Sequence, residues 1–208
     1  IQEGRIAAIG DLEGARAGRV IDAKDLVVSP GFIDIHSHSD TTLIANGNAE
    51  SKIRQGVTTE VVGQDGSSIG PWTDGEFEST RDRYRRLYGV EIDFRDLPGF
   101  FDRLGRTPAS VNLASMVGAG SVRGAVVGPD DRGATAEELA RMVALVREGL
   151  AAGACGLSSG LEYVPGGFAD LDDFAKIHHR EAGRHMAHHR KLMGDEHHGQ
   201  AKLVTKIL

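Results

Sequence analysis

Residues 29–38 read Ser29-Pro30-Gly31-Phe32-Ile33-Asp34-Ile35-His36-Ser37-His38, an apolar strand that ends in two histidines. Side chains at positions i and i+2 of a strand share one face, so His36 and His38 are predicted to project the same way, together with Asp34. Neutral imidazole is a good ligand for divalent ions. The pattern therefore predicts a metal site at the strand end, and the alternative is two polar residues satisfied by their neighbours.

The chain after this strand alternates strands and helices. Val57–Val62 is a β-branched strand, and further strands are predicted at 110–117 and 154–158, with helices at 49–55 and 97–104. The clearest helix follows Thr135, which forms a capping box with Glu138. Its apolar residues recur at helical spacing: Leu139, Met142, Val143, Val146 and Leu150. Repeated strand–helix–strand units predict an α/β fold with a parallel sheet, either doubly wound or closed as a barrel.

Three other segments differ from this pattern. Short, partly alternating apolar runs at 6–9 and 19–28 predict strands of a small β unit. The polar residues 73–96 are interpreted as an insertion or lid beside the sheet. Residues 176–208 hold seven of the nine histidines and carry seven Lys and Arg against three Asp and Glu, a net +4. This tail is either a solvated basic end or a histidine-rich metal-storage or sensing module.

Composition excludes several classes of protein. The 208 residues suffice for one ordinary domain or part of a larger one. The formal charge of −6 provides no general attraction to nucleic acid, and no apolar run approaches the roughly 20 residues that span a bilayer, so neither nucleic acid nor membrane is an expected partner. A single cysteine, Cys155, favours a reducing, cytoplasmic setting. The sequence carries no signal of oligomeric state.

Residues 29–40 resemble the first metal-binding strand of the amidohydrolase superfamily, and more narrowly that of the D-aminoacylases, or N-acyl-D-amino-acid deacylases. Four further segments agree in order: Gly4–Gly10, Lys52–Gly63, Gly156–Gly166 and Lys191–Gly194. The resemblance implies a partial (β/α)₈ TIM-type barrel with the N-terminal strands of a small β-sandwich. It assigns residues 1–28 to the sandwich, 29–194 to the barrel and 195–208 to the start of a barrel helix.

The resemblance also implies a chemistry. One or two divalent ions, zinc by expectation, are held by His36 and His38 and activate water for attack on the carbonyl of an N-acyl-D-amino acid. The products are a carboxylate and a free D-amino acid. Where the family has Asn-Cys-Gly, this chain has Gln64-Asp65-Gly66, so Asp65 is either a harder metal ligand or a turn residue. Cys155 is expected to be a buried small residue and no substitute for the family cysteine.

Later positions carry roles implied by the resemblance alone. An alignment on Lys191 makes His189 a metal ligand, with His188 the alternative if one residue is inserted. Lys191 is then expected to hold the substrate carboxylate. Tyr163 is expected either to face the acyl group of the substrate or to be a packed aromatic residue at a strand end.

Some family features are missing from these residues. No Thr-His-x-Arg motif occurs, so the resemblance implies that about one βα unit is lacking near 177–179. The late-strand aspartate that serves as general base has no counterpart, which leaves the catalytic base unknown. We therefore expect an incomplete, weakly active or inactive fragment of a deacylase. The alternatives are a cyclic-amide hydrolase of the hydantoinase or dihydroorotase type and a non-catalytic remnant.

Overall fold

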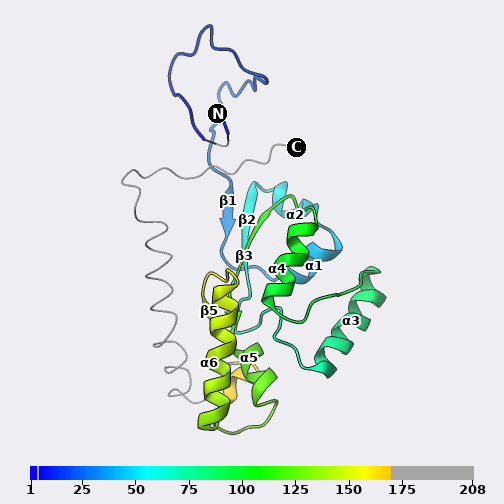
Figure 1. Cartoon of the computed structure of the whole chain (residues 1–208). Coiled ribbons are helices and arrows are strands. Elements are labelled where there is room, and N and C mark those ends of the chain that lie inside the picture. The colour runs from blue at the N-terminus through cyan, green and yellow to red at the C-terminus, as the bar shows by residue number, and fades with distance from the viewer. Residues whose placement is uncertain (4, 170–208) are drawn as a thin grey trace.

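The computed structural model describes residues 1–3 and 5–169 and has an α/β fold whose sheets contain only parallel strand pairs (Figure 1). The strands are β1 (Phe32–Asp34), β2 (Val57–Val62), β3 (Asn112–Ser115), β4 (Val117–Gly118) and β5 (Leu157–Ser158). The helices are α1 (Asp40–Ala45), α2 (Glu50–Ile53), α3 (Asp74–Tyr88), α4 (Leu97–Arg106), α5 (Ala119–Val126) and α6 (Ala136–Ala151), followed by a 3₁₀ turn at Gly166–Phe168.

The strands form one sheet in the order β1-β2-β3 and a second sheet of β4 and β5. Residue Glu60 of β2 lies between Asp34 of β1 and Leu113 of β3 in the register. Because the strands are parallel, the carboxyl ends of β1 and β2 lie at the same edge of the sheet. Side chains that follow these two strands are therefore brought together.

The hydrophobic core is formed mainly by apolar residues of α3, α4, α5 and α6, together with Val117 of β4. Figure 1 shows α5 and α6 side by side, and Phe100, Val122 and Val146 are completely buried. The predicted apolar stripe of α6 is confirmed, since Met142, Val146 and Leu150 are buried and the other two members pack partly buried against the core. In the described part of the chain, no helix combines the length and the hydropathy that crossing a bilayer requires.

Residues 73–96, interpreted as an insertion or lid beside the sheet, contain α3. This helix begins with a capping box between Thr73 and Glu76 and buries Phe77 and Tyr84 in the core. Burial raises the pKa of Tyr84 from its ordinary value of 10.0 to about 12. The mean polarity of the segment hid the helix, whereas its capping box was a readable signal.

The strands predicted at 6–9 and 19–28 are absent from the described structure. The only pairing among described residues before β1 is an isolated antiparallel bridge between Gln2 and Arg5. Apolar side chains there are largely exposed, with Val27 at 93% and Ile9 at 87%. A strand needs a neighbour that satisfies its backbone groups, and the described residues provide none for these runs. Their place in a sandwich therefore stays a prediction.

The capping box of α6 makes a pH-dependent contribution to stability. Hydrogen bonds from Arg132, and then from the Thr135 backbone, lower the pKa of Glu138 from its ordinary value of 4.5 to about 2. A lowered pKa stabilises the fold fully above about 4.5, and this contribution is lost as the pH falls towards 2. In urea denaturation, Glu138→Gln is expected to lose less stability than the parent between pH 7 and pH 3. Glu137→Gln is the matched control, and parallel losses in Glu138→Gln and the parent would contradict the prediction.

Candidate metal centre

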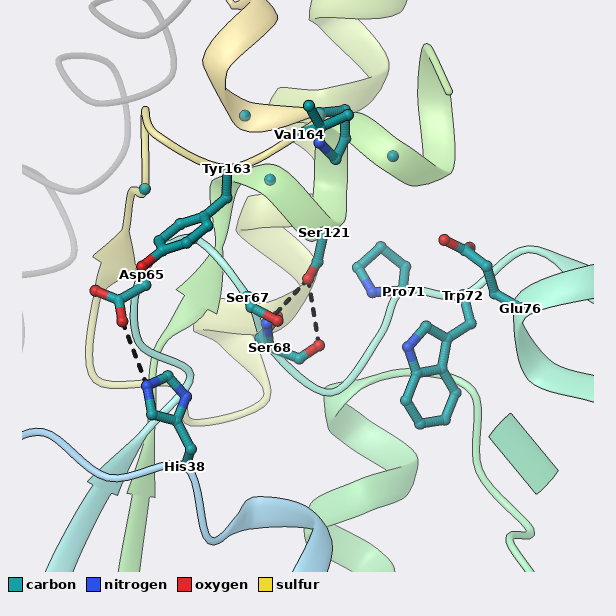
Figure 2. Close-up of a pocket in the computed structure, with 16 residues that line it drawn as sticks. His38, Asp65, Ser67, Ser68, Pro71, Trp72, Glu76, Ser121, Tyr163 and Val164 are labelled. Carbon is teal, nitrogen blue, oxygen red and sulfur yellow. Dashed lines mark hydrogen bonds and ion pairs between the residues drawn. The ribbon is translucent and has the colours of Figure 1, made fainter. Parts of the chain in front are cut away.

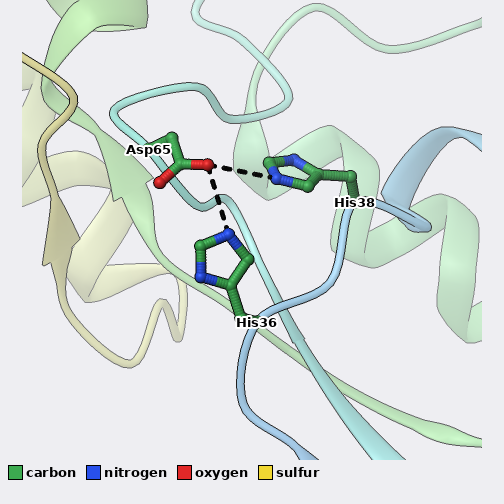
Figure 3. A group of neighbouring side chains, drawn as sticks. All are labelled: His36, His38 and Asp65. Atoms are coloured by element: carbon green, nitrogen blue, oxygen red, sulfur yellow. Dashed lines mark hydrogen bonds and ion pairs between the residues drawn. The ribbon is translucent and has the colours of Figure 1, made fainter. Parts of the chain in front are cut away.

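Two histidines and one aspartate converge at the carboxyl ends of β1 and β2 (Figure 3). The Nε2 atoms of His36 and His38 lie 3.2 Å and 3.3 Å from the same oxygen, Oδ2 of Asp65. The two imidazole rings are 5.4 Å apart in an edge-to-face arrangement. The predicted common face of the two histidines is therefore confirmed, and Asp65 joins them from the next strand.

The local sequence explains how these three side chains meet. β1 ends at Asp34, and the chain then bends, with the Ser37 amide donating to the Val61 carbonyl. β2 ends at Val62 and leads into a turn in which Asp65 has a left-handed φ of 54° and Gly66 one of 73°. Aspartate tolerates this conformation better than most residues. Asp65 is thus a turn residue, as one interpretation had it, and its carboxylate nevertheless faces both histidines.

The distances from Asp65 to the two histidines suit a zinc ion. With zinc bonds of about 2.0–2.1 Å, two ligands of one tetrahedral ion lie roughly 3.3 Å apart. The two nitrogen–oxygen distances, 3.2 Å and 3.3 Å, match that edge and also suit hydrogen bonds. Both imidazoles are 56% exposed, which leaves room for further ligands. Two nitrogens and one carboxylate oxygen are a donor set that zinc accepts.

Asp34 does not join this group, contrary to the prediction that it shares the face of the histidines. Its carboxylate accepts from the His36 amide at 3.1 Å and from Lys52 Nζ at 2.5 Å. The hydrogen bond from Lys52 is the main cause that lowers the pKa of Asp34, and the same bond raises the pKa of Lys52. The regular alternation of side chains between the two faces of β1 ends at Asp34. The Asp34 side chain therefore does not share a face with His36 and His38, which lie beyond the bend.

A cavity of about 560 Å³ opens beside the metal-ligand group (Figure 2). His38 and Asp65 form part of its wall, so the cavity has direct access to the candidate metal centre. Its other walls come from the loop after β2, the start of α3, the start of α5 and the segment after β5: Gly66, Ser67, Ser68, Pro71, Trp72, Glu76, Gly120, Ser121, Gly124, Gly160, Tyr163, Val164, Pro165 and Gly166. A small molecule with an amide bond fits a space of this size.

The remaining predicted site residues have different outcomes. Tyr163 lines the cavity, is more than half exposed and extends towards Asp65 in Figure 2, so it is not a packed core aromatic. His189, its alternative His188, and Lys191 lie outside the described residues. Cys155 is exposed, which corrects the expectation that it is buried, and it is not part of the ligand group.

Prediction from the sequence missed the residues that support the histidines. Gln64 donates from Nε2 to the Ile35 carbonyl at 2.8 Å, and Ser37 donates to the buried carboxylate of Glu60 at 2.5 Å. The signal was present, because a glutamate inside the β-branched run Val57–Val62 has to be buried and paired.

Known proteins resemble this chain in sequence. A model of the amidohydrolase family matches residues 19–92. The D-aminoacylase of Alcaligenes xylosoxydans xylosoxydans is 38% identical over 195 residues, which covers 88% of this chain and 40% of that protein. The chain therefore spans about two fifths of the length of such relatives.

Two solved structures agree with the sequence match. A D-aminoacylase with a binuclear metal centre superposes with a TM-score of 0.73 at 39% identity, over 84% of this chain and 36% of that one. The N-acyl-D-glutamate deacylase of Bordetella bronchiseptica, complexed with zinc and a phosphonate inhibitor, gives 0.75 at 34% identity, over 91% and 38%. The chain is thus similar to the amidohydrolases over residues 19–92 and, over most of its length, to the D-aminoacylases and N-acyl-D-amino-acid deacylases.

Proposed function

We propose that this protein is a metal-dependent deacylase that hydrolyses the amide bond of N-acyl-D-amino acids to a carboxylate and a free D-amino acid. The observation that carries the proposal is the group of His36, His38 and Asp65 at the wall of a 560 Å³ cavity. The related D-aminoacylase and the zinc-complexed deacylase support both the substrate class and the choice of zinc.

The residues of the cavity have separable tasks in this reaction. His36, His38 and Asp65 would hold one divalent ion, which when bound polarises the acyl carbonyl and lowers the pKa of water. Tyr163, which lines the same cavity as His38, would contact the acyl group of the substrate. The Ser68 amide donates a hydrogen bond to Ser121 Oγ at 2.9 Å. This bond joins the loop after β2 to the start of α5 and would hold that part of the cavity wall in place.

The architecture is part of the same proposal. Residues 29–194 would supply part of a (β/α)₈ barrel, because β1, β2 and β3 are parallel neighbours in chain order with helices between them. In such barrels the site lies at the carboxyl ends of the strands, as His36 and Asp65 do here. Residues 1–28 would contribute strands to a β-sandwich, and the single cysteine is consistent with a cytoplasmic location.

Release of free D-amino acid tests the proposed activity. With N-acetyl-D-methionine or N-acetyl-D-glutamate and added zinc, the 208-residue chain is expected to react far below an ordinary rate of about 10 s⁻¹. The reason is that the sequence has no Thr-His-x-Arg motif and no assigned general base. General acid–base catalysis typically raises a reaction rate ~10²–10⁴-fold. The L-enantiomers and the double variant His36→Ala/His38→Ala are the controls. Equal release by the double variant would contradict the proposal, and no release at all would favour the non-catalytic remnant.

Asp65 is expected to act as a ligand as well as a turn residue. Asp65→Asn keeps a side chain that tolerates the left-handed turn but removes the charge, so zinc affinity should fall about 10–100-fold. Asp65→Cys should shift the preference towards softer ions such as Cd²⁺. Calorimetric titration measures both effects, with Ser67→Ala in the same loop as control. Unchanged zinc affinity in Asp65→Asn would assign this residue to the turn alone.

A further inference from the structure

Glu60 is completely buried in the middle strand of the sheet, at the centre of an otherwise β-branched segment. Its register neighbours are Asp34 on β1 and Leu113 on β3. Burying a carboxylate costs several kcal/mol unless hydrogen bonds and an opposite charge compensate it. A hydrophobic residue at this position would complete the strand at no such cost, so the contacts of Glu60 require an explanation.

Those contacts are directed at one short segment. Oε2 of Glu60 accepts from Ser37 Oγ and from Ser39 Oγ, each at 2.5 Å. Each hydroxyl has one proton, so when both protons point at Glu60 neither serine donates elsewhere. Lys52 Nζ lies 3.5 Å from the same oxygen and 2.5 Å from Asp34, and provides the positive charge. The second oxygen, Oε1, has no hydrogen-bond partner among the described residues.

The two serines alternate with the two candidate ligands. In the order His36, Ser37, His38, Ser39, the histidines face Asp65 and the serines face Glu60. The ladder of β1 ends at Asp34, so this segment lacks the regular strand pairing that would fix its side chains. Only the Ser37 amide continues the pairing, by its bond to the Val61 carbonyl. The serine–glutamate bonds take the place of the missing ladder.

We propose that Glu60 is a positioning residue for the metal centre. It holds Ser37 and Ser39 from inside the sheet and thereby fixes the backbone from which both imidazoles reach the ion. This inference rests on the proposed metal-dependent function but concerns residues that do not touch the ion. Groups that orient metal ligands typically change metal affinity 10–100-fold when they are removed.

The test is a zinc titration of the full 208-residue chain by calorimetry. The binding that disappears in His36→Ala/His38→Ala defines the candidate site and separates it from binding by other histidines of the chain. Glu60→Gln and Ser39→Ala are expected to weaken zinc binding at this site about 10–100-fold. Ser39→Thr keeps the hydroxyl and should retain the parent's affinity. Ser115→Ala, which removes a buried hydroxyl from β3, is the matched control and should do the same.

Two further readouts separate positioning from simple destabilisation. Urea denaturation without metal gives the folded fraction of each variant. The visible spectrum of bound Co²⁺ reports the geometry of the ligands in the molecules that are folded, and it should change in Glu60→Gln and Ser39→Ala but not in Ser115→Ala. If Glu60→Gln does not fold, the pair Ser39→Ala and Ser39→Thr still decides, because Ser39 is only partly buried.

Each outcome has one meaning. Weakened binding with an altered Co²⁺ spectrum in Glu60→Gln and Ser39→Ala, and rescue in Ser39→Thr, supports the inference. The inference would be overturned if Glu60→Gln and Ser39→Ala keep the parent's affinity and spectrum while His36→Ala/His38→Ala loses zinc binding. The proposed metal centre would then still stand. If His36→Ala/His38→Ala binds zinc as the parent does, the proposed metal centre itself is overturned, and the inference with it.

Discussion

Replacing His36 and His38 together with alanine is expected to remove one equivalent of bound zinc and all zinc-dependent deacylation. The two imidazoles supply two of the three ligand atoms found at the site. A single remaining carboxylate from Asp65 is a weak zinc ligand. Both imidazoles are more than half exposed, so the metal-free variant should unfold at nearly the same urea concentration as the parent.

The measurement is elemental analysis of protein dialysed against buffered zinc. Because seven histidines lie between 178 and 198, the comparison is made with His178→Ala/His179→Ala, which removes the same number of imidazoles elsewhere. We expect this control to keep the equivalent of zinc that His36→Ala/His38→Ala loses. Equal zinc content in the two double variants would show that His36 and His38 hold no separate ion.

Gly160→Ala is expected to damage both the fold and the metal centre. A Cβ atom at this position would lie 2.1 Å from the Asp65 backbone oxygen and 2.9 Å from the Tyr163 ring. The first neighbour is backbone and cannot rotate away, so the turn that carries Asp65 has to move. We expect a loss of about 1–3 kcal/mol in the free energy of unfolding. Zinc affinity should fall at least about tenfold, since a displaced ligand no longer completes the group.

Gly156→Ala is the matched control, because it changes the same residue type four positions earlier. A Cβ there meets nothing closer than the Met116 sulfur at 3.8 Å, which is ordinary contact. Urea denaturation and zinc titration are compared for the two variants. If Gly160→Ala and Gly156→Ala behave alike in both measurements, the close approach of residue 160 to the Asp65 turn does not support the site.

Much of the fold was predictable where local sequence and tertiary packing agree. Val57–Val62 forms a strand with the predicted bounds, because its β-branched residues are paired on both sides. The helix at Ala136–Ala151 begins at the predicted capping box of Thr135 and Glu138. The histidine pair was predictable because residues two positions apart, such as His36 and His38, still project to one side even where the strand bends.

Other features depended on contacts that no local pattern encodes. The length of β1 is set by pairing with β2, so the predicted face of Asp34 was wrong. The role of Tyr84 in the core depends on helices distant in sequence. A glutamate inside a β-branched strand indicated a buried, paired carboxylate at Glu60, but its partners Ser37 and Ser39 became known only from the tertiary structure.

Anomalous diffraction at the zinc absorption edge, from crystals of the 208-residue protein grown with zinc, tests the proposed metal centre most stringently. We expect an anomalous peak about 2.0–2.2 Å from Nε2 of His36, Nε2 of His38 and Oδ2 of Asp65. The same peak should be absent from crystals of His36→Ala/His38→Ala. Zinc found only at other histidines, with no peak among these three atoms, would show that His36, His38 and Asp65 do not form a metal centre.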